Sequence, residues 1–240
     1  MTGQDVVNRA QVLLNDSGNT NAQVAANTRW PTTELLLWIT DAQREAVIVS
    51  PNVGNTVMSV QLVAGTRQSL ASTLEAWLLL SVRRNLTSTG GAGRAIRQTT
   101  AAILDAYNPN WHTDTPTATV QNYVFDVEDK KVFYVYPPND GTGFVEANVA
   151  ATPAPVTSLT QVLTLDDVYL GALASYVCYR ALMKDAEYAG GSQLAQAFYQ
   201  QFFQSMTAQG TASKTDSPNT SFATQAIQEP DAVPPPQARK

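Results

Sequence analysis

Histidine, cysteine and paired carboxylates build most enzyme and metal sites, and this sequence offers few of them. It has one histidine, His112, and one cysteine, Cys178, far apart in the sequence. Zinc sites need three or four ligands at short, set spacing, so these two residues predict none. His112 lies in a turn-like stretch without an evident orienting partner, and we interpret it as an ordinary turn residue. Cys178 lies in an apolar helical pattern and is expected to be a buried, unreactive thiol.

Two short segments could bind phosphate or a hard cation. Gly90-Gly91-Ala92-Gly93 has the glycines of a phosphate loop, but Ile96 stands where a dinucleotide-binding loop needs glycine, and no Gly-Lys-Ser/Thr follows. The carboxylates Asp126, Glu128 and Asp129 lack calcium-loop spacing, and two lysines follow them. We interpret both segments as turns, the second a solvated hairpin turn. We therefore expect no cofactor, no metal and no enzyme activity, although two distant carboxylates meeting in the fold could still make a hydrolase.

The basic residues concentrate at Arg83, Arg84, Arg94 and Arg97. These are candidates for contact with a DNA backbone or with an acidic neighbouring subunit, and the alternative is a solvated polar surface. With 20 acidic and 15 basic residues, the chain has a formal net charge of -5, the wrong sign for tight neutralisation of phosphates. Any contact with double-stranded DNA is therefore expected to be loose and independent of sequence.

Four tryptophans, at positions 30, 38, 77 and 111, could stack against sugars. They fall in different segments, and three adjoin apolar runs or helix starts, which favours packing in the core. A carbohydrate-binding module for host recognition is kept as an alternative function.

Apolar spacing predicts helices at the two ends of the chain. The first carries Val6 to Leu14, with Thr2 and Asp5 as a capping pair, and the second spans Thr32 to Ser50. Near the other end, Thr164 is expected to cap a helix that has Asp166 and Asp167 at its positive end. After a break at Gly190-Gly191, an apolar stripe from Leu194 to Met206 predicts the last helix.

The middle of the sequence alternates in the manner of short strands. The clearest signal is a hairpin of strands 123–126 and 132–136, the second ended by Pro137-Pro138. Further strands are expected at 57–63, 77–82 and 144–149. A helix running from Ile96 to Tyr107 is expected to interrupt them.

These elements predict an α+β fold: an antiparallel helix bundle from the N- and C-terminal helices, an inserted small antiparallel β domain, and an extended C-terminal arm. The corresponding segments are 1–52 and 162–211 for the bundle, 53–161 for the β domain, and 212–240 for the arm. The arm has only three sizeable apolar residues, Phe222, Ile227 and Val233, so it is either disordered or ordered by docking on a partner. Neither a membrane span nor a secretory signal is evident, so synthesis in a cytoplasm is expected.

Several short sequence segments follow one another in an order and at a spacing that resemble those of a known family. They are Arg29-Trp30-Pro31 with Glu34-Leu35-Leu36 and Asp41-Ala42-Gln43-Arg44-Glu45; Ala64-Gly65-Thr66-Arg67-Gln68; Phe133-Tyr134-Val135-Tyr136-Pro137-Pro138; and Tyr179-Arg180-Ala181 with Lys184-Asp185-Ala186-Glu187. From about residue 3 to 207 the chain resembles the head-to-tail adaptor proteins of tailed bacteriophages, which include tail-tubular-protein-A-like subunits.

The resemblance implies a homo-oligomeric ring, of twelve copies, under the portal protein in the virion neck, assembled in the host cytoplasm. The ring would extend the DNA channel and dock a tail or nozzle protein; another neck connector or a tail-completion protein is the alternative. By analogy, the arm should lie along the portal or an adjacent subunit. Arg67, Gln68, Arg180, Lys184, Asp185 and Glu187 are candidate subunit or domain contacts, with intramolecular capping and surface pairing as the alternative.

Overall fold

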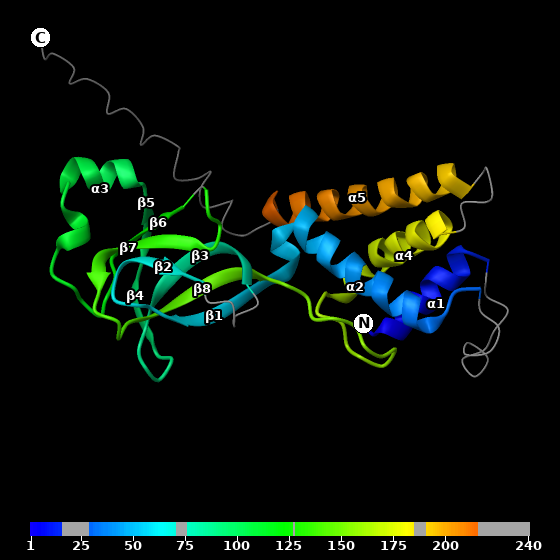
Figure 1. Cartoon of the computed structure of the whole chain (residues 1–240), viewed down its shortest axis with the longest axis horizontal. Coiled ribbons are helices and arrows are strands. Elements are labelled where there is room, and N and C mark those ends of the chain that lie inside the picture. Colours follow the sequence, from blue (N-terminus) through cyan, green and yellow to red (C-terminus); the bar gives the residue numbers. More distant parts are fainter. Residues whose placement is uncertain (16–28, 71–75, 127, 185–190, 216–240) are drawn as a thin grey trace, which may run out of the picture.

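The computed structural model describes residues 1–15, 29–70, 76–126, 128–184 and 191–215, with only the backbone for 209–215. These residues form an elongated molecule with a helical lobe (α1, α2, α4 and α5) and a β lobe (the strands and α3) (Figure 1). The helices are α1 (Gly3–Leu13), α2 (Thr32–Val49), α3 (Ala101–Tyr107), α4 (Leu170–Lys184) and α5 (Gly191–Thr215). The strands are β1 (Asn55–Gln61), β2 (Gly65–Ser69), β3 (Ala76–Leu86), β4 (Ala92–Ala95), β5 (Arg97–Thr99), β6 (Asn122–Phe125), β7 (Val132–Asn139) and β8 (Phe144–Ala151).

The α+β prediction is confirmed by this mixture of helices and mainly antiparallel sheets. The antiparallel direction of the helices, the bundle and the segment limits stay predictions. At the C-terminal end, α5 continues to Thr215, so residues 212–215 are helical and not part of an extended arm as expected. Residues Phe222, Ile227 and Val233 lie outside the described part of the chain.

The centre of the helical lobe is α4, which contacts α1, α2 and α5. Every residue from Ala172 to Cys178 is buried, so the helix is covered on all sides. The small side chains Ala172, Ala174 and Ala181 let neighbouring helices approach closely. The apolar core around α4 also includes Ala150 at the end of β8, which joins it to the β lobe.

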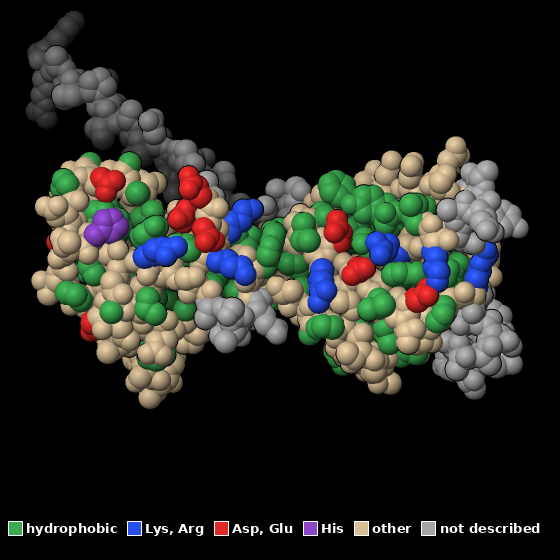
Figure 2. Space-filling model, viewed as in Figure 1, with side chains coloured by type: hydrophobic (Ala, Val, Ile, Leu, Met, Phe, Trp, Pro, Cys, Tyr) green, Lys and Arg blue, Asp and Glu red, His purple; other side chains and the backbone are tan. Residues whose placement is uncertain are grey.

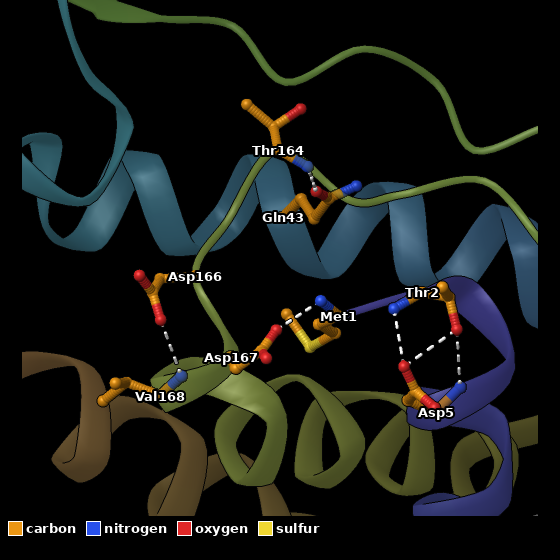
Figure 3. Close-up of polar contacts among 8 residues, drawn as sticks. All are labelled: Met1, Thr2, Asp5, Gln43, Thr164, Asp166, Asp167 and Val168. Atoms are coloured by element: carbon orange, nitrogen blue, oxygen red, sulfur yellow. Dashed lines mark hydrogen bonds and ion pairs between the residues drawn. The ribbon is translucent and has the colours of Figure 1, made fainter.

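Polar contacts order the start of α1 and the turn that leads into α4, which both lie near the N-terminus of the chain (Figure 3). The predicted capping pair is confirmed: the Asp5 carboxylate accepts from the Thr2 backbone N–H at 2.7 Å, and the Asp5 N–H donates to Thr2 Oγ1 at 3.4 Å. The Thr2 backbone N–H, followed by the Thr2 hydroxyl, lowers the pKa of Asp5 below 3.8. The charged carboxylate is therefore part of the cap.

The start of α4 differs from the prediction. Asp166, not Thr164, caps the short 3-10 turn that leads into the helix, where its carboxylate accepts from the Val168 N–H at 3.2 Å. Thr164 instead donates its backbone N–H to Gln43 Oε1 on α2 at 3.2 Å (Figure 3). Thr164 lies too early in the chain to reach the first free N–H groups of the turn. Asp167 forms an ion pair with the N-terminal ammonium group of Met1.

The β lobe is built from two four-stranded sheets, ordered β1-β8-β3-β4 and β2-β7-β6-β5. Their apolar side chains form one core that includes Val60, Leu79, Phe133 and Val145. Among the strands that the structure describes, all pairings are antiparallel except that of β5 with β6, which is parallel. The predicted domain was entirely antiparallel.

The helix expected from Ile96 to Tyr107 begins only at Ala101. Ile96 is buried in the β core, and its N–H donates to the Arg83 carbonyl at 3.0 Å. The Arg97 N–H donates to the Gln121 carbonyl, also at 3.0 Å, and starts β5. Tertiary pairing with strands distant in sequence therefore overrides the local helical spacing.

Strand β7 continues through Pro137-Pro138 to Asn139, although the prolines were expected to end it. Proline lacks a donor but keeps its carbonyl acceptor. The Pro138 carbonyl accepts from the Thr117 N–H at 2.8 Å, and Asn139 pairs with Gly65 of β2. Neighbouring segments thus continue the strand without a proline N–H.

Two buried asparagines tie loops to the sheets. Asn139 donates to the carbonyls of Thr117 (3.0 Å) and Ala118 (3.2 Å) and accepts from the N–H of Gly141 at 2.8 Å. Asn85 donates to the carbonyls of Arg94 (2.9 Å) and Val120 (2.7 Å). Each amide replaces backbone pairing where the strands diverge.

We expect Asn139→Ala to lower the free energy of unfolding by roughly 2 to 4 kcal/mol, because buried donors and acceptors lose their partner. Urea unfolding followed by circular dichroism measures the change. The control Asn8→Ala, which removes an exposed amide, should stay within about 0.5 kcal/mol of the parent. A loss for Asn139→Ala as small as that of the control would contradict the proposed role of the amide.

We expect Asp5→Ala to lower the thermal midpoint at neutral pH. Because the folded pKa of Asp5 is lowered, its stabilisation is present at pH values above the pKa of an unfolded aspartate and is lost as the pH falls through the lowered folded pKa. The difference between parent and variant should therefore shrink in acid. The control Glu128→Ala removes an exposed carboxylate and should show no such convergence. A midpoint difference that is independent of pH would argue against the charged cap.

Candidate functional site

The side chains that could do chemistry do not converge. Within the described ranges, no group of three or more His, Cys, Asp and Glu could hold a metal ion. Cys178 is fully buried, its Sγ lies 3.7 Å from the Ala10 carbonyl, and burial raises the pKa of its thiol to about 12. His112 is exposed in a short 3-10 turn, stacks on Trp111 and has the Thr66 hydroxyl 2.8 Å from Nδ1. The neutral hydroxyl of Thr66 orients this histidine.

Of the two polar segments, the glycine cluster is a turn only in part. Gly90, with a positive φ of 83°, and Gly91 lie in the turn between β3 and β4, whereas Ala92 and Gly93 belong to strand β4. Asp126 accepts from the Glu128 N–H at 2.9 Å, within the hairpin turn between β6 and β7.

The tryptophans mainly pack inside the protein. Trp30 and Trp38 are buried in the helical core, and Trp111 is buried beside α3. Trp77 of β3 is partly buried against the helical core. The expectation of core packing is confirmed for the three buried rings, whose faces are not open to a sugar.

The four clustered arginines, Arg83, Arg84, Arg94 and Arg97, divide into a pair close to a carboxylate and a pair that is not. Arg83 and Arg84 of β3 lie 3.7 Å and 4.0 Å from the carboxylate of Glu146 on β8. Arg94 and Arg97 lie on β4 and β5 and are exposed. Neither has a carboxylate within 4.0 Å among the residues that the structure describes. Their charge is therefore available to another molecule.

A polar hollow lies between Arg94 and Arg97, lined also by Ala95, Gln121 and Asn122. It sits where the chain crosses from β4 of one sheet to β5 of the other. Sequence proximity suggested this grouping, but the crossing that brings Gln121 and Asn122 to it required the fold.

Arg67 and Gln68 of β2 differ in burial. Gln68 is buried; its amide accepts from the Val63 N–H at 2.7 Å and donates to the carbonyls of Val63 (2.9 Å) and Gly65 (3.0 Å). These bonds shape the turn between β1 and β2. Arg67 is exposed and is the member of the pair that can reach another molecule.

Arg180 and Lys184 join α4 to α2. Lys184 Nζ lies 2.6 Å and 2.5 Å from the two carboxylate oxygens of Glu34, and Arg180 Nη2 lies 3.5 Å from Asp41 Oδ2. A shallow hollow lies between these pairs. Asp185 and Glu187 lie outside the described residues.

Apolar side chains gather on the outer face of the helical lobe, along α5 (Figure 2). On α5, Leu194 and Phe203 are exposed, and Tyr199, Gln200 and Gln204 line a hollow with Phe203. Exposed apolar surface of this kind is typical of a protein that binds others.

Comparison with known families settles the class of protein. A family model described as SU10 adaptor protein matches residues 1–222. The chain belongs to the SU10 adaptor protein family. No curated protein matches it. The SU10 adaptor family agrees with the resemblance to phage structural adaptors; the narrower likeness to tail-tubular-protein-A-like subunits stays a prediction. Within the described residues of this SU10 adaptor, no helix combines the length and apolar character needed to cross a membrane.

The burial of Cys178 predicts that its thiol does not react with a soluble disulfide reagent in the folded protein. Reaction should appear only when denaturant unfolds the helical lobe. Absorbance of the released reagent thiol measures both states. Rapid labelling of the folded chain would contradict the buried position.

We expect Phe202→Ala to cost about 3 to 5 kcal/mol of unfolding free energy, because the ring is fully buried beside α4. Lys184→Ala should cost less than about 1 kcal/mol, since its ion pair with Glu34 is exposed. Chemical denaturation of both variants tests this order. Equal losses would mean that the ion pair stabilises the lobe far more than its exposure allows.

Proposed function

We propose that this SU10 adaptor assembles as a ring of twelve copies beneath the portal protein of a tailed phage. The ring extends the DNA channel and docks a tail or nozzle protein, in a virion neck assembled in the host cytoplasm. The observation that carries the proposal is the family match over residues 1–222.

The form of the molecule supports this proposal. Two lobes with separate cores give one chain two ends, so that it can contact different partners on either side (Figure 1). A neck subunit acts through such surfaces and requires no reacting group. The net charge of -5 suits a channel through which DNA slides without tight binding.

The candidate contacts differ in what is available to a partner. Arg94 and Arg97 offer unpaired charge to DNA or to an acidic neighbouring subunit, whereas Arg83 and Arg84 already face Glu146. Arg67 is exposed, while Arg180 and Lys184 must share their charge with α2. Asp185 and Glu187, and Phe222, Ile227 and Val233 for the portal-binding arm, remain proposals from the sequence.

Mixing the chain with the portal protein of the same phage tests the proposal. We expect the two to cosediment and electron microscopy to show a ring of adaptor beneath the portal. Cosedimentation with purified tails, and none with portal, would favour a different neck or tail-completion protein. Binding to neither would overturn the assignment.

The arm has its own test. A chain ending at Thr215, where α5 ends, should bind portal more weakly than the full chain, as should a full chain with Phe222, Ile227 and Val233 changed to alanine. The control is a full chain with Ser217, Thr220 and Ser221 changed to alanine, which alters polar residues of the same segment. Equal affinity for portal in all four proteins would show that the arm does not bind it.

A further inference from the structure

In the described part of the chain, the sheet β1-β8-β3-β4 has two edges that pair with no further strand. Strand β1 pairs only with β8, and β4 pairs only with β3, among the residues that the structure describes. All four residues of β4 are exposed, as are most of β1. Each edge therefore presents backbone donors and acceptors that another strand could use.

The strand β1 itself carries none of the features that usually protect an edge against such pairing. Natural edge strands carry lysines, prolines or bulges, or are very short. The seven residues Asn55–Gln61 include no charge and no proline, and they pair with β8 without a register shift. Val57, in the middle, is 51% exposed. A regular, uncharged edge of this length is expected to be covered in the working protein.

The directions of the two edges make them complementary. Each of the three pairings in the sheet is antiparallel, so β4 runs opposite to β1. If a second copy continues the sheet in the same orientation, its β4 lies antiparallel to β1 of the first. The alternation of strand directions then passes unbroken from one copy to the next.

We propose that β4 of one subunit pairs with β1 of the next, so that the ring of the proposed function, on which this inference rests, is joined by a sheet shared between subunits. Such a contact is head to tail and uses two different surfaces, as a ring with more than two subunits requires.

The proposed pairing of β4 with β1 also has a preferred register. One row of cross-strand partners runs Ser59, Glu146, Arg84 and Ala95. A second row, two residues further along β1, runs Gln61, Phe144, Leu86 and Ala92. In the proposed arrangement each row continues without stagger into the same row of the neighbour, so Ala95 of one subunit lies opposite Ser59 of the next.

Charge supports the same arrangement. Arg94 lies between the two rows on β4 and has no carboxylate partner among the described residues. Asp140 lies in the turn at the Gln61 end of β1, where Gln61 Nε2 donates to the Gly141 carbonyl at 3.5 Å. The Thr142 hydroxyl and N–H donate to the carboxylate of Asp140 and lower its pKa, and no ion pair to this carboxylate occurs within the described ranges. When the rows of the two subunits are aligned in this register, the exposed Asp140 carboxylate of one subunit lies on the side of Arg94 of its neighbour.

Crosslinking in the assembled complex tests the proposed pairing of β4 with β1 between subunits. The full chain with Ser59→Cys and Ala95→Cys is mixed with portal and treated with a short bis-maleimide reagent; the native Cys178 is buried. We expect a ladder of dimers, trimers and higher multiples on a denaturing gel. The control pair Ser59→Cys and Ala106→Cys, with the second cysteine on exposed α3, should give none.

A second variant tests the same contact by its effect on ring formation, with the thermal midpoint as a check that the chain still folds. Val57→Lys places a charge on the exposed edge and should abolish or strongly reduce rings, with an unchanged thermal midpoint. The control Ile103→Lys, on exposed α3, should leave rings intact.

The outcomes separate the two proposals. Rings beneath the portal without the Ser59 to Ala95 ladder, or unaffected by Val57→Lys, overturn the shared sheet and leave the adaptor function standing. Dimers from Ser59→Cys alone would show β1 meeting β1, which also overturns it. No assembly of the parent chain with portal overturns both.

Discussion

The pairing of β1 with β8 is the constraint on which the rest of the molecule depends. These two strands leave and re-enter the helical lobe, and they lie side by side from Asn55 with Ala150 to Gln61 with Phe144. Because the chain returns where it left, α4 can fill the centre of the helices that precede the β lobe. The connector after β8 is held by α2, where Thr40 Oγ1 accepts from the Val156 N–H at 2.9 Å.

The helices and the hairpin could be predicted because their signals are local. Thr2 and Asp5 are three residues apart and cap α1, and the apolar stripe of α2 repeats at helical spacing. The mistakes arose where distant segments decide the outcome. Ile96 fits a helical pattern but belongs to the β core, and the carbonyl of Pro138 finds its donor in a loop twenty-odd residues earlier, at Thr117.

The candidate contacts show the same division. Sequence grouped Arg83, Arg84, Arg94 and Arg97, but only the fold separates the pair facing Glu146 from the pair without a carboxylate. Gln68 could not be distinguished from Arg67, since its role depends on the turn at Val63. Asn85 and Asn139 gave no signal, because a buried amide resembles any loop asparagine until its partners are known. Edge strands are likewise a property of sheet order, which local pattern does not contain.

The seclusion of the sulfur in α4 bears on the life cycle of a virus particle. In the function proposed above, the particle is built in a reducing cell interior and later released into oxidising surroundings. Because this sequence has a single cysteine and the helical core encloses it, copies of the chain in the proposed ring present no thiol to one another. The contacts of that ring would therefore stay free of disulfide links between subunits.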